Sequence, residues 1–468
     1  MHFFTLSVNK NSNSLNKFHP FTLLLQHKMI NKPLNMIWNS KYECMSREEM
    51  RELQGEKLRK IVAHAYHNSP FYKARFDEHG VRPEDIKTID DIVKLPFTTK
   101  QDLRDNYPFN MLAVPMSEIV RLHASSGTTG KPIVVGYTEK DLDNWTEGVA
   151  RCLTAYGLDK SDMIQVSYGY GLFTGGLGAH AGVQKIGAVV LPTSSGNTEK
   201  QLQLMQDFGS TAIACTPSYA LYMTEEIRKR NIDMNNIKLK VGVFGAEPWT
   251  DNMRKELEEK LHIKAYDIYG LTEISGPGVG GECECQNGTH LWEDLFYPEI
   301  VDPVTLQPVA PGEKGELVFT TLDKWGMPMI RYRTRDLTSL KYEKCECGRT
   351  AVRMSKIMGR SDDMLIIRGV NVFPSQVESI LLEFPEYEPY FFIEVDRVNN
   401  TDTFVIQVEV KPEYYTDQIN QLIKLRQRLA SRIQSVIGIQ PDIKIVEPNT
   451  IERSTGKAKR AIDHRKFE

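Results

Sequence analysis

The chain has 468 residues, of which 41% are hydrophobic and 25% are charged, and its formal net charge is −3. This length allows two or more domains with a large core, and the composition is ordinary for a globular protein. The small net charge gives no basis for nucleic acid as the main partner, and no apolar run approaches the ~20 residues needed to cross a membrane. Seven cysteines without a convincing signal peptide favour a cytoplasmic protein, in which clustered cysteines more often bind metal or act in catalysis than form disulfides.

The first 35 residues differ from the rest of the chain. They are rich in Asn, Ser, Lys and His, and their apolar patch at 21–25 is too short for a secretory signal peptide. Periodic sequence begins only at Met36. We therefore expect Met36 to be the physiological start and residues 1–35 to be an extension that is disordered or loosely packed. A native N-terminus that retains Met1 would contradict this.

An N-terminal helical cap is expected over about residues 36–110. The stretch from Ser46 to Phe76 opens with a capping-box pattern, Ser46 followed by Glu49, and continues with apolar residues at helical spacing. Residues 84–95 and 98–107 have the pattern of short helical or turn segments. This cap leads into the stretch with the strongest ligand signal.

That stretch is a predicted hairpin with a phosphate-sized tip. Two β-rich runs, 119–123 and 133–137, flank a tip made of Ser125, Ser126, Gly127, Thr128, Thr129, Gly130 and Lys131. Glycines let backbone N–H groups approach an anion, and the hydroxyls and the lysine add donors and charge. A P-loop is excluded because Ser125 replaces the first glycine, Pro132 replaces the Ser/Thr, and a strand follows instead of a helix. A Ser/Gly turn without a ligand is the alternative.

Helical and strand patterns alternate after the hairpin. The expected buried strands are Met163–Val166, Ala188–Leu191, Ala212–Cys215 and Val241–Phe244, and the expected helices are Glu139–Tyr156, Glu199–Phe208 and Tyr219–Arg230. A glycine-rich passage, Tyr168–Gly178, follows the first of these strands. The alternation favours an α/β domain with at least one mostly parallel sheet.

A second domain is expected after a linker at residues 360–363. Its expected elements are an amphipathic helix at Pro374–Phe384, a strand at Thr403–Val410, a long helix at Thr416–Val436 and a strand at Ile443–Val446. We therefore divide the chain into an N-terminal domain, 36–360, and an α+β C-terminal domain, 361–468.

The stretch Asp267–Glu273 is predicted to be a strand that ends in a turn carrying a hydroxyl and a carboxylate. Thr272 is suited to bind a phosphate oxygen and Glu273 to bind Mg²⁺, which favours one or two carboxylates together with substrate phosphates. A surface turn without a ligand is the alternative.

Three further polar stretches follow. They are Arg331–Asp336, whose carboxylate is suited to accept both hydroxyls of a ribose, Gly359–Asp363 at the linker, and Arg453–Lys457, a second Gly-Lys tip. Each of them alone is equally consistent with a solvated charged loop.

Together, in this order and at this spacing, the motifs resemble those of the adenylate-forming superfamily of acyl- and aryl-CoA ligases, from about Met36 to the end of the chain. Within it, six stretches are similar to phenylacetate-CoA ligases: 36–39, 168–178, 245–249, 269–280, 292–294 and 367–374. The resemblance implies an α/β fold with a large N-terminal adenylate-forming domain and a small, mobile α+β C-terminal domain.

The resemblance also implies roles for individual residues. Residues 125–131 would hold the β- and γ-phosphates of ATP, Thr272 the α-phosphate and Glu273 the Mg²⁺. The adenine would lie between Gly245, Ala246, Glu247 and Pro248 on one side and Asp267, Ile268, Tyr269 and Gly270 on the other. Asp336, assisted by Arg360, would bind the ribose. Asp362 matches the hinge, and Lys457 matches the lysine that enters the site for adenylation and leaves it for thioester formation.

For the acid, an aryl ring needs apolar walls and space beside the reacting carboxylate. Tyr168, Phe173, Gly245 and Ala246 are the candidates, although the two aromatic side chains are equally suited to pack a core. Ala181 departs from the family, in which a larger residue is expected. If this position lines the pocket, a bulkier acid such as an indolic or hydroxylated aryl acid would fit.

Four cysteines are clustered in the sequence as two Cys-x-Cys pairs, with His290 between the pairs. Thiolates and imidazoles are zinc ligands, although this spacing is unusual for zinc, so unligated thiols are the alternative. The resemblance implies a Cys/His site in this region, which Cys283, His290, Cys345 and Cys347 fit best, with Cys285 as the alternate ligand. Such a closed site would be structural.

The expected function is an ATP-dependent aryl-acid:CoA ligase that forms an acyl-adenylate. One alternative is an enzyme that passes the adenylated acid to a carrier protein or an amine. The other is a non-catalytic nucleotide-binding homologue, against which Lys457 and Glu273 argue. A homodimer is expected from the family alone.

Overall fold

The computed structural model describes residues 36–125, 132–361, 364–368, 370–398, 401–415, 419–454 and 458–465. The expected extension at 1–35 lies outside these residues. Among the described residues, no helix combines the length and the apolar character needed to span a bilayer.

The N-terminal segment is helical, as expected. Its helices are α2 (Ser40–Glu43), α3 (Arg47–Asn68), α4 (Pro70–Glu78) and α5 (Lys100–Asp105), with short 3₁₀ turns at Pro83–Asp85 and Ile89–Lys94. Ser46 and Glu49 form the predicted capping box at the start of α3. The single helical stretch predicted for 46–76 is wrong in one respect, because α3 ends at Asn68 and a second helix, α4, begins at Pro70. Proline fits this first helical position because its missing N–H would be unpaired there in any case.

The predicted hairpin is present. Strands β1 (Arg121–Ser125) and β2 (Ile133–Tyr137) pair antiparallel, with Ser125 opposite Ile133. The tip residues 126–131 lie outside the described residues.

The largest sheet in the described part of the chain has the strand order β13-β14-β9-β8-β7-β6-β5-β3-β4. Its strands are β3 (Met163–Val166), β4 (Val189–Leu191), β5 (Ala212–Cys215), β6 (Val241–Gly245), β7 (Lys264–Leu271), β8 (Gly276–Gly281), β9 (Thr289–Leu291), β13 (Leu340–Lys341) and β14 (Arg353–Met354). The pairs from β4 to β7 are parallel, and β8, β9, β14 and β13 extend the sheet antiparallel. The expectation that 188–191 is a buried strand is wrong, because β4 pairs only with β3 and Val189 at this edge is 52% exposed.

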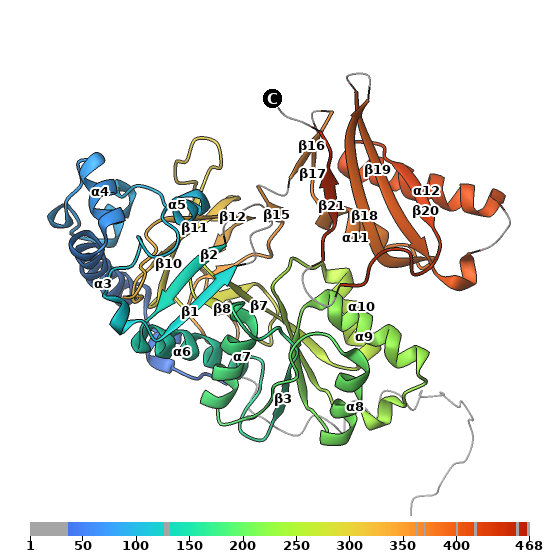
Figure 1. The fold of residues 1–468 in the computed structure, drawn as a ribbon, viewed down its shortest axis with the longest axis horizontal. Coiled ribbons are helices and arrows are strands. Elements are labelled where there is room, and N and C mark those ends of the chain that lie inside the picture. Colours follow the sequence, from blue (N-terminus) through green and yellow to red (C-terminus); the bar gives the residue numbers. More distant parts are fainter. Residues whose placement is uncertain are drawn as a thin grey trace, which may run out of the picture. The chain divides into compact units, whose positions relative to one another are not determined.

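Helices cover both faces of this sheet (Figure 1). They are α6 (Glu139–Ala155), α7 (Thr174–Lys185), α8 (Thr198–Phe208), α9 (Pro217–Lys229) and α10 (Asp251–Leu261). Neighbouring strand residues point to opposite faces. Ala212 and Ala214 therefore belong to the core shared with α6 and α7, while Ile213 and Cys215 belong to the core shared with α8, α9 and α10.

A smaller antiparallel sheet follows in the chain. Its strands are β10 (Phe296–Val301), β11 (Gly315–Thr321), β12 (Tyr332–Thr338) and β15 (Gly359–Arg360), in this order. The expected polar run that ends at Asp336 is thus part of strand β12, in which every second side chain is buried.

The C-terminal residues build a hydrophobic core of their own, which extends from Ile367 to Ile443. Its elements are β16 (Leu365–Ile367), β17 (Val370–Val372), α11 (Pro374–Leu381), β18 (Tyr387–Val398), β19 (Thr401–Val410), α12 (Ile419–Ile437), β20 (Asp442–Val446) and β21 (Ala461–Asp463). A four-stranded sheet, β20-β19-β18-β21, packs against α11 and α12. The α+β character expected for this part is confirmed.

Candidate active site and thiol cluster

The carboxyl ends of the parallel strands collect the predicted adenine residues. β6 ends at Gly245, which pairs with Ile268 of β7. A Cβ at Gly245 would lie 2.3 Å from the Ile268 carbonyl oxygen, so this close approach requires glycine. Ala246 follows with a φ of 71°, in the left-handed region that few side chains adopt. Ligands of α/β proteins bind in the crevice at this edge of a sheet, which fits a nucleotide site.

The turn after β7 is buried, which excludes the surface-turn alternative. Thr272 is 7% exposed and Glu273 is 6% exposed. The Tyr137 hydroxyl donates to the Thr272 carbonyl oxygen at 3.2 Å, and the hydroxyls of Thr272 and Thr174 lie 3.3 Å apart. The backbone and the hydroxyl of Thr272 are therefore held by contacts from β2 and α7.

Lys324 anchors the same turn and was not predicted. Its ammonium donates to the Glu273 carbonyl oxygen at 3.0 Å and lies 4.8 Å from the centroid of the Tyr137 ring. Burial lowers the pKa of Lys324 to about 8, although the nearby carboxylates of Asp141 and Glu273 act in the opposite direction. Lys324 lies in an ordinary loop after β11, and no motif marks it.

The predicted ribose residues are brought together. Asp336 of β12 and Arg360 of β15 are paired directly across the strands. The Tyr269 hydroxyl donates to Asp336 Oδ2 at 2.6 Å, and Arg360 Nη1 donates to Asp336 Oδ1 at 3.1 Å. Asp336 is 8% exposed, so its carboxylate is held in one orientation by a phenol and a guanidinium.

Asp267 has a more elaborate setting than the sequence predicted. Its Oδ1 accepts a hydrogen bond from Trp249 Nε1 at 3.0 Å, and its backbone N–H donates to Glu282 Oε2 at 2.8 Å. Burial raises the pKa of the Asp267 carboxyl to about 6, and the neighbouring carboxylate of Glu282 acts in the same direction. Arg254 pairs with Glu282 through hydrogen bonds of 2.9 and 2.8 Å. Arg254 and Glu282 were not predicted.

Glu247 joins the adenine segment to the C-terminal part of the chain. Its Oε1 accepts a hydrogen bond from the backbone N–H of Ser218 at 2.8 Å. Its Oε2 accepts a hydrogen bond from the backbone N–H of Ala458 at 3.0 Å. Ala458 directly follows Lys457, the lysine predicted to act in adenylation.

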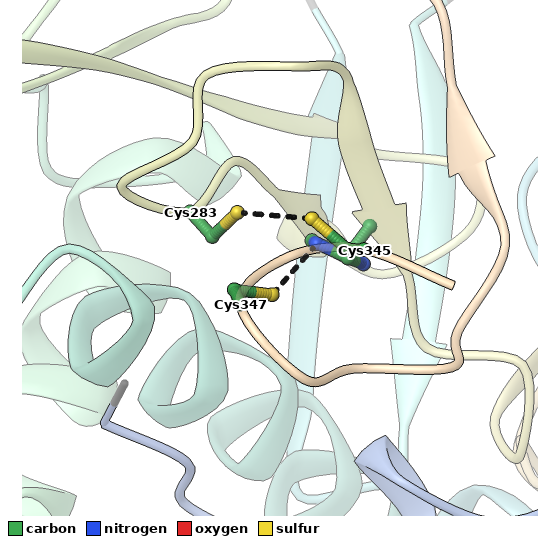
Figure 2. A group of neighbouring side chains, drawn as sticks. Cys283, Cys345 and Cys347 are labelled. Atoms are coloured by element: carbon green, nitrogen blue, oxygen red, sulfur yellow. Dashed lines mark hydrogen bonds between the residues drawn. The ribbon is translucent and has the colours of Figure 1, made fainter. Parts of the chain in front are cut away.

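The expected zinc ligands come together in a buried thiol cluster, which consists of Cys283, His290, Cys345 and Cys347 (Figure 2). One ligand atom from each residue lies within 4.8 Å of those of the other three. The Cys283 and Cys345 sulfurs are 3.8 Å apart, and Cys347 Sγ is 3.5 Å from His290 Nε2. Tetrahedral zinc has ligand-to-ligand distances of about 3.8 Å between sulfurs and about 3.5 Å from sulfur to nitrogen, from its usual bond lengths. These two distances fit a zinc site, and Cys285 lies beside the cluster, half-buried.

The thiols of Cys347 and Cys283 are shifted in opposite directions: the pKa of Cys347 is lowered, whereas the hydrogen bond with Cys347 and burial raise the pKa of Cys283. A hydrogen bond with Cys283 and the imidazole of His290 lower the pKa of the Cys347 thiol well below its usual range. Arg349, which was not predicted, lies 3.6 Å from Cys347 Sγ through Nη1. Its Nε donates to Glu43 Oε2 at 2.6 Å, and its Nη2 donates to the Met36 carbonyl oxygen at 2.7 Å. The side chains of Arg349 and Glu43 are fully buried, so this ion pair ties the first described segment to the cluster.

Comparison with known proteins assigns the family. The profile of the AMP-binding enzyme family matches residues 48–322, and that of the AMP-binding enzyme C-terminal domain matches residues 369–465. The chain belongs to the AMP-binding enzymes. It is 52% identical over 435 residues to the phenylacetate-coenzyme A ligase of Escherichia coli, an alignment that covers 92% of this chain and 99% of the relative. It is 48% identical over 445 residues to the phenylacetate-coenzyme A ligase of Thermus thermophilus, which covers 92% and 100% of the two chains.

A solved relative of this AMP-binding enzyme has the same fold. The crystal structure of 2-hydroxyisobutyryl-CoA ligase in the postadenylation state with 2-HIB-AMP matches with a TM-score of 0.88 and 29% identity, covering 94% of both chains. The same protein in the thioesterification state, with 2-HIB-AMP and CoA, matches with a TM-score of 0.69. The resemblance to phenylacetate-CoA ligases and the expected fold class are thus confirmed.

The candidate acid residues of this AMP-binding enzyme lie in different environments. Tyr168 is 4% exposed, whereas Phe173, at the N-cap of α7, is 42% exposed. The Phe173 ring lies over Gly175, where a Cβ would meet it at 2.4 Å. Ala181 lies on the half-buried face of α7 together with His180. Whether these residues line an acid pocket stays a prediction.

Some predicted residues lie outside the described part of the chain. They are Ser126, Gly127, Thr128, Thr129, Gly130 and Lys131 of the hairpin tip, Asp362 of the hinge, and Lys457. Ser125 is described, at the end of β1, and its hydroxyl oxygen is buried with no hydrogen-bond partner among the described residues.

Proposed function

We propose that this AMP-binding enzyme is an ATP-dependent acid:CoA ligase whose acid is phenylacetate or a related arylacetate. The observation that carries the proposal is the 52% identity to the E. coli phenylacetate-coenzyme A ligase over 92% of the chain. The clustering of the predicted nucleotide residues at the carboxyl edge of the sheet supports it. The substrates are then small molecules, namely the acid, ATP and CoA.

The nucleotide roles that we propose are those implied by the family resemblance, and the contacts of Asp336 support its role. Residues 245–248 lie along the adenine, and Asp267, Ile268, Tyr269 and Gly270 lie on its other side. Asp336 accepts the ribose hydroxyls, because Tyr269 and Arg360 hold its carboxylate in one orientation. Thr272 binds the α-phosphate, and residues 125–131 bind the β- and γ-phosphates.

The first half-reaction follows from the charges involved. A carboxylate oxygen of the acid attacks the α-phosphorus, the bond from this phosphorus to the bridging oxygen breaks, and pyrophosphate leaves with the electron pair. Lys457 and the donors of 125–131 hold the negative charge that develops on the phosphates. Glu273 is suited to hold Mg²⁺, which prefers carboxylate oxygens and would add positive charge to the bound phosphates.

The second half-reaction needs a rearrangement of the C-terminal part. The CoA thiol loses its proton to solvent, and its sulfur forms a bond with the acyl carbon. The bond from this carbon to the phosphate oxygen of the adenylate breaks, and AMP leaves with the electron pair, giving the thioester. We propose that residues 361–468 rotate about Asp362 between the half-reactions, so that Lys457 leaves the site. The two states of 2-hydroxyisobutyryl-CoA ligase, which match this chain with TM-scores of 0.88 and 0.69, support a large rearrangement in that relative.

For the acid we propose a pocket made by Tyr168, Phe173, Gly245 and Ala246. Glycine and alanine leave space for the acid beside the adenylate, and the aromatic rings supply apolar walls. A cytoplasmic location and a homodimer stay predictions.

We further propose that the thiol cluster holds one structural Zn²⁺. Two of its ligand-atom distances, from Cys283 to Cys345 and from Cys347 to His290, match a tetrahedral site, and zinc would cross-link the segment at 283–290 to the segment at 345–347. Metal analysis of protein purified without chelator should find one zinc per chain, with loss of zinc in a Cys345→Ser variant. A metal-free wild-type protein would favour unligated thiols.

The experiment for the ligase function is a screen for AMP release. Phenylacetate, hydroxyphenylacetate, indoleacetate, benzoate and short fatty acids are each supplied with ATP, with and without CoA. Arylacetates should release AMP rapidly only with CoA and yield the aryl-CoA. Turnover of fatty acids alone would refute the aryl pocket. Pyrophosphate exchange without consumption of CoA would favour transfer to a carrier protein or an amine, and no turnover at all would favour a non-catalytic homologue.

A further inference from the structure

Lys100 faces the predicted magnesium carboxylate from outside the main sheet. It is the first residue of α5, in the helical segment that precedes the hairpin. Its ammonium lies 3.9 Å from Glu273 Oε1, although the two residues are 173 positions apart in the sequence. The Lys100 side chain is 38% exposed, whereas that of Glu273 is 8% exposed. Among the described residues, its ammonium makes no other ion pair or hydrogen bond.

The backbone that carries Lys100 is fixed to the site. The backbone of Thr98 donates to the Arg331 carbonyl oxygen at 3.0 Å and accepts from the Arg333 N–H at 2.9 Å. Thr98 is thereby bound to the start of β12, the strand that carries Asp336. Thr99 caps α5 by accepting a hydrogen bond from the Asp102 N–H. Lys100 therefore starts from an anchored position, and only its side chain is free to move.

Within the described part of the chain, two lysines approach the 272–273 turn, and they differ in their exposure to a ligand. Lys324 is 4% exposed and donates a hydrogen bond to the Glu273 backbone carbonyl oxygen. Its ammonium therefore stabilises the turn and is not accessible to a ligand. Lys100 approaches the Glu273 carboxylate instead and stays partly exposed. Its contact is too long for a hydrogen bond, and ion pairs with a partly exposed partner are weak. Little free energy therefore holds Lys100 to Glu273.

We infer that Lys100 is a further catalytic residue, which binds the phosphates of magnesium-bound ATP during adenylation. The inference rests on the proposed ligase function. Mg²⁺ held with ATP at Glu273 would add positive charge there, so Lys100 would leave the carboxylate for the phosphate oxygens, which attract its ammonium. In the empty site the same lysine balances the charge of Glu273.

The role of Lys100 in the chemical step is electrostatic. As the bond from the α-phosphorus to the bridging oxygen breaks, the electron pair passes to pyrophosphate, and the Lys100 ammonium stabilises this charge without transferring a proton. The helical segment at 36–118 would then contribute directly to catalysis.

The test compares Lys100→Met with Lys100→Arg, and uses Lys94→Met as the matched control. Lys94 lies in the same segment, is 48% exposed and pairs with Asp91. Adenylation is measured by acid-dependent exchange of pyrophosphate into ATP. Lys100→Met should lower kcat/KM for ATP about 10- to 100-fold, as expected for the loss of a hydrogen bond to a charged group. Lys100→Arg should stay within a few-fold of wild type, and Lys94→Met should be unchanged.

Two further measurements separate the possible failures. Transfer from supplied phenylacetyl-adenylate to CoA should be unchanged in Lys100→Met, and binding of magnesium α,β-methylene-ATP, measured by calorimetry, should weaken about 10-fold or more. Wild-type exchange and analogue binding in Lys100→Met would overturn the inference, as would equal losses in both half-reactions. A wild-type chain that binds the analogue but neither exchanges pyrophosphate nor acylates CoA would instead refute the proposed ligase function, and the analogue comparison would still test Lys100.

Discussion

Replacing Glu247 by Gln should impair adenylation more than thioester formation. In the structure, the two carboxylate oxygens accept hydrogen bonds from the backbone N–H groups of Ser218 and Ala458, at 2.8 and 3.0 Å. A glutamine has the same shape but one acceptor oxygen, so its amide group must face one of the two N–H donors. We expect the longer contact, to Ala458, to be lost.

The size of the effect follows from the type of bond. A hydrogen bond to a charged group contributes about 1.5–3 kcal/mol, which corresponds to a factor of about 10 to 150 in an equilibrium. Because Ala458 follows Lys457 directly, loss of this bond should reduce the fraction of enzyme with the lysine held for adenylation. The expected result is at least about a tenfold slower pyrophosphate exchange.

The assay measures the two half-reactions separately in the Glu247→Gln variant. Transfer of the acyl group from supplied phenylacetyl-adenylate to CoA should be unchanged or faster, because it does not need this contact. Glu313→Gln is a matched control, since Glu313 also accepts a backbone hydrogen bond, at 3.2 Å from Ala310, but on the exposed surface. Equal losses in both half-reactions, or no loss in either, would refute the reasoning.

Three other predictions concern buried groups. Arg349→Met leaves the Glu43 carboxylate buried without its cation and should lower the free energy of unfolding by about 3–5 kcal/mol in urea titrations; a loss under ~1 kcal/mol would contradict the buried ion pair. The pKa of Lys324 is about 8 in the folded chain against an ordinary value of 10.5, so the unfolded chain binds more protons between these values and the unfolding free energy should rise with pH across this window. The Lys324→Met variant should lack this pH-dependent part of the unfolding free energy. If the variant and the wild type had identical pH profiles, the pKa of Lys324 would not be lowered in the folded chain. Removal of zinc by a chelator should lower the Tm of the wild type but leave that of Cys345→Ser unchanged, whereas equal shifts would point to an effect unrelated to the thiol cluster.

Local sequence patterns predicted helices and strands well where an apolar run or a capping motif marked the element. The strand at 163–166 agrees with β3, and the capping box at Ser46 marks the true start of α3. Helix α7 was missed because its glycines disfavour a helix in isolation. They are needed for packing: a Cβ at Gly178 would lie 2.4 Å from the Trp145 ring, and one at Gly182 would lie 2.2 Å from Val149. Tertiary contact overrides local preference there, and no window of sequence contains that contact.

The edge position of β4 was equally hidden from the sequence. A short apolar run such as 188–191 has the same pattern in the middle of a sheet and at its edge, because the pattern does not record how many neighbours a strand has. Only the topology shows that β4 pairs with β3 alone.

In the candidate site, motifs singled out the residues that we propose to face the nucleotide but not the residues that contact and hold them. Asp336 and Arg360 were expected together and are in contact. Lys324 and Lys100 were missed because each acts on Glu273 across a long stretch of chain and neither belongs to a recognisable motif. Such residues support the site because they lie close to Glu273 in the folded chain, and a single sequence does not reveal which distant residues come close.

The pairing of Arg349 with Glu43 has a consequence for folding during synthesis. The two residues are 306 positions apart, so the ribosome must add most of the chain before Glu43 meets its cation. Until then, burial of Glu43 would leave its charge unpaired, which opposes early docking of α2. We therefore expect α2 to join the structure late, after the segment that carries Cys345, Cys347 and Arg349 has emerged. Docking of α2 would then be one of the last steps of folding.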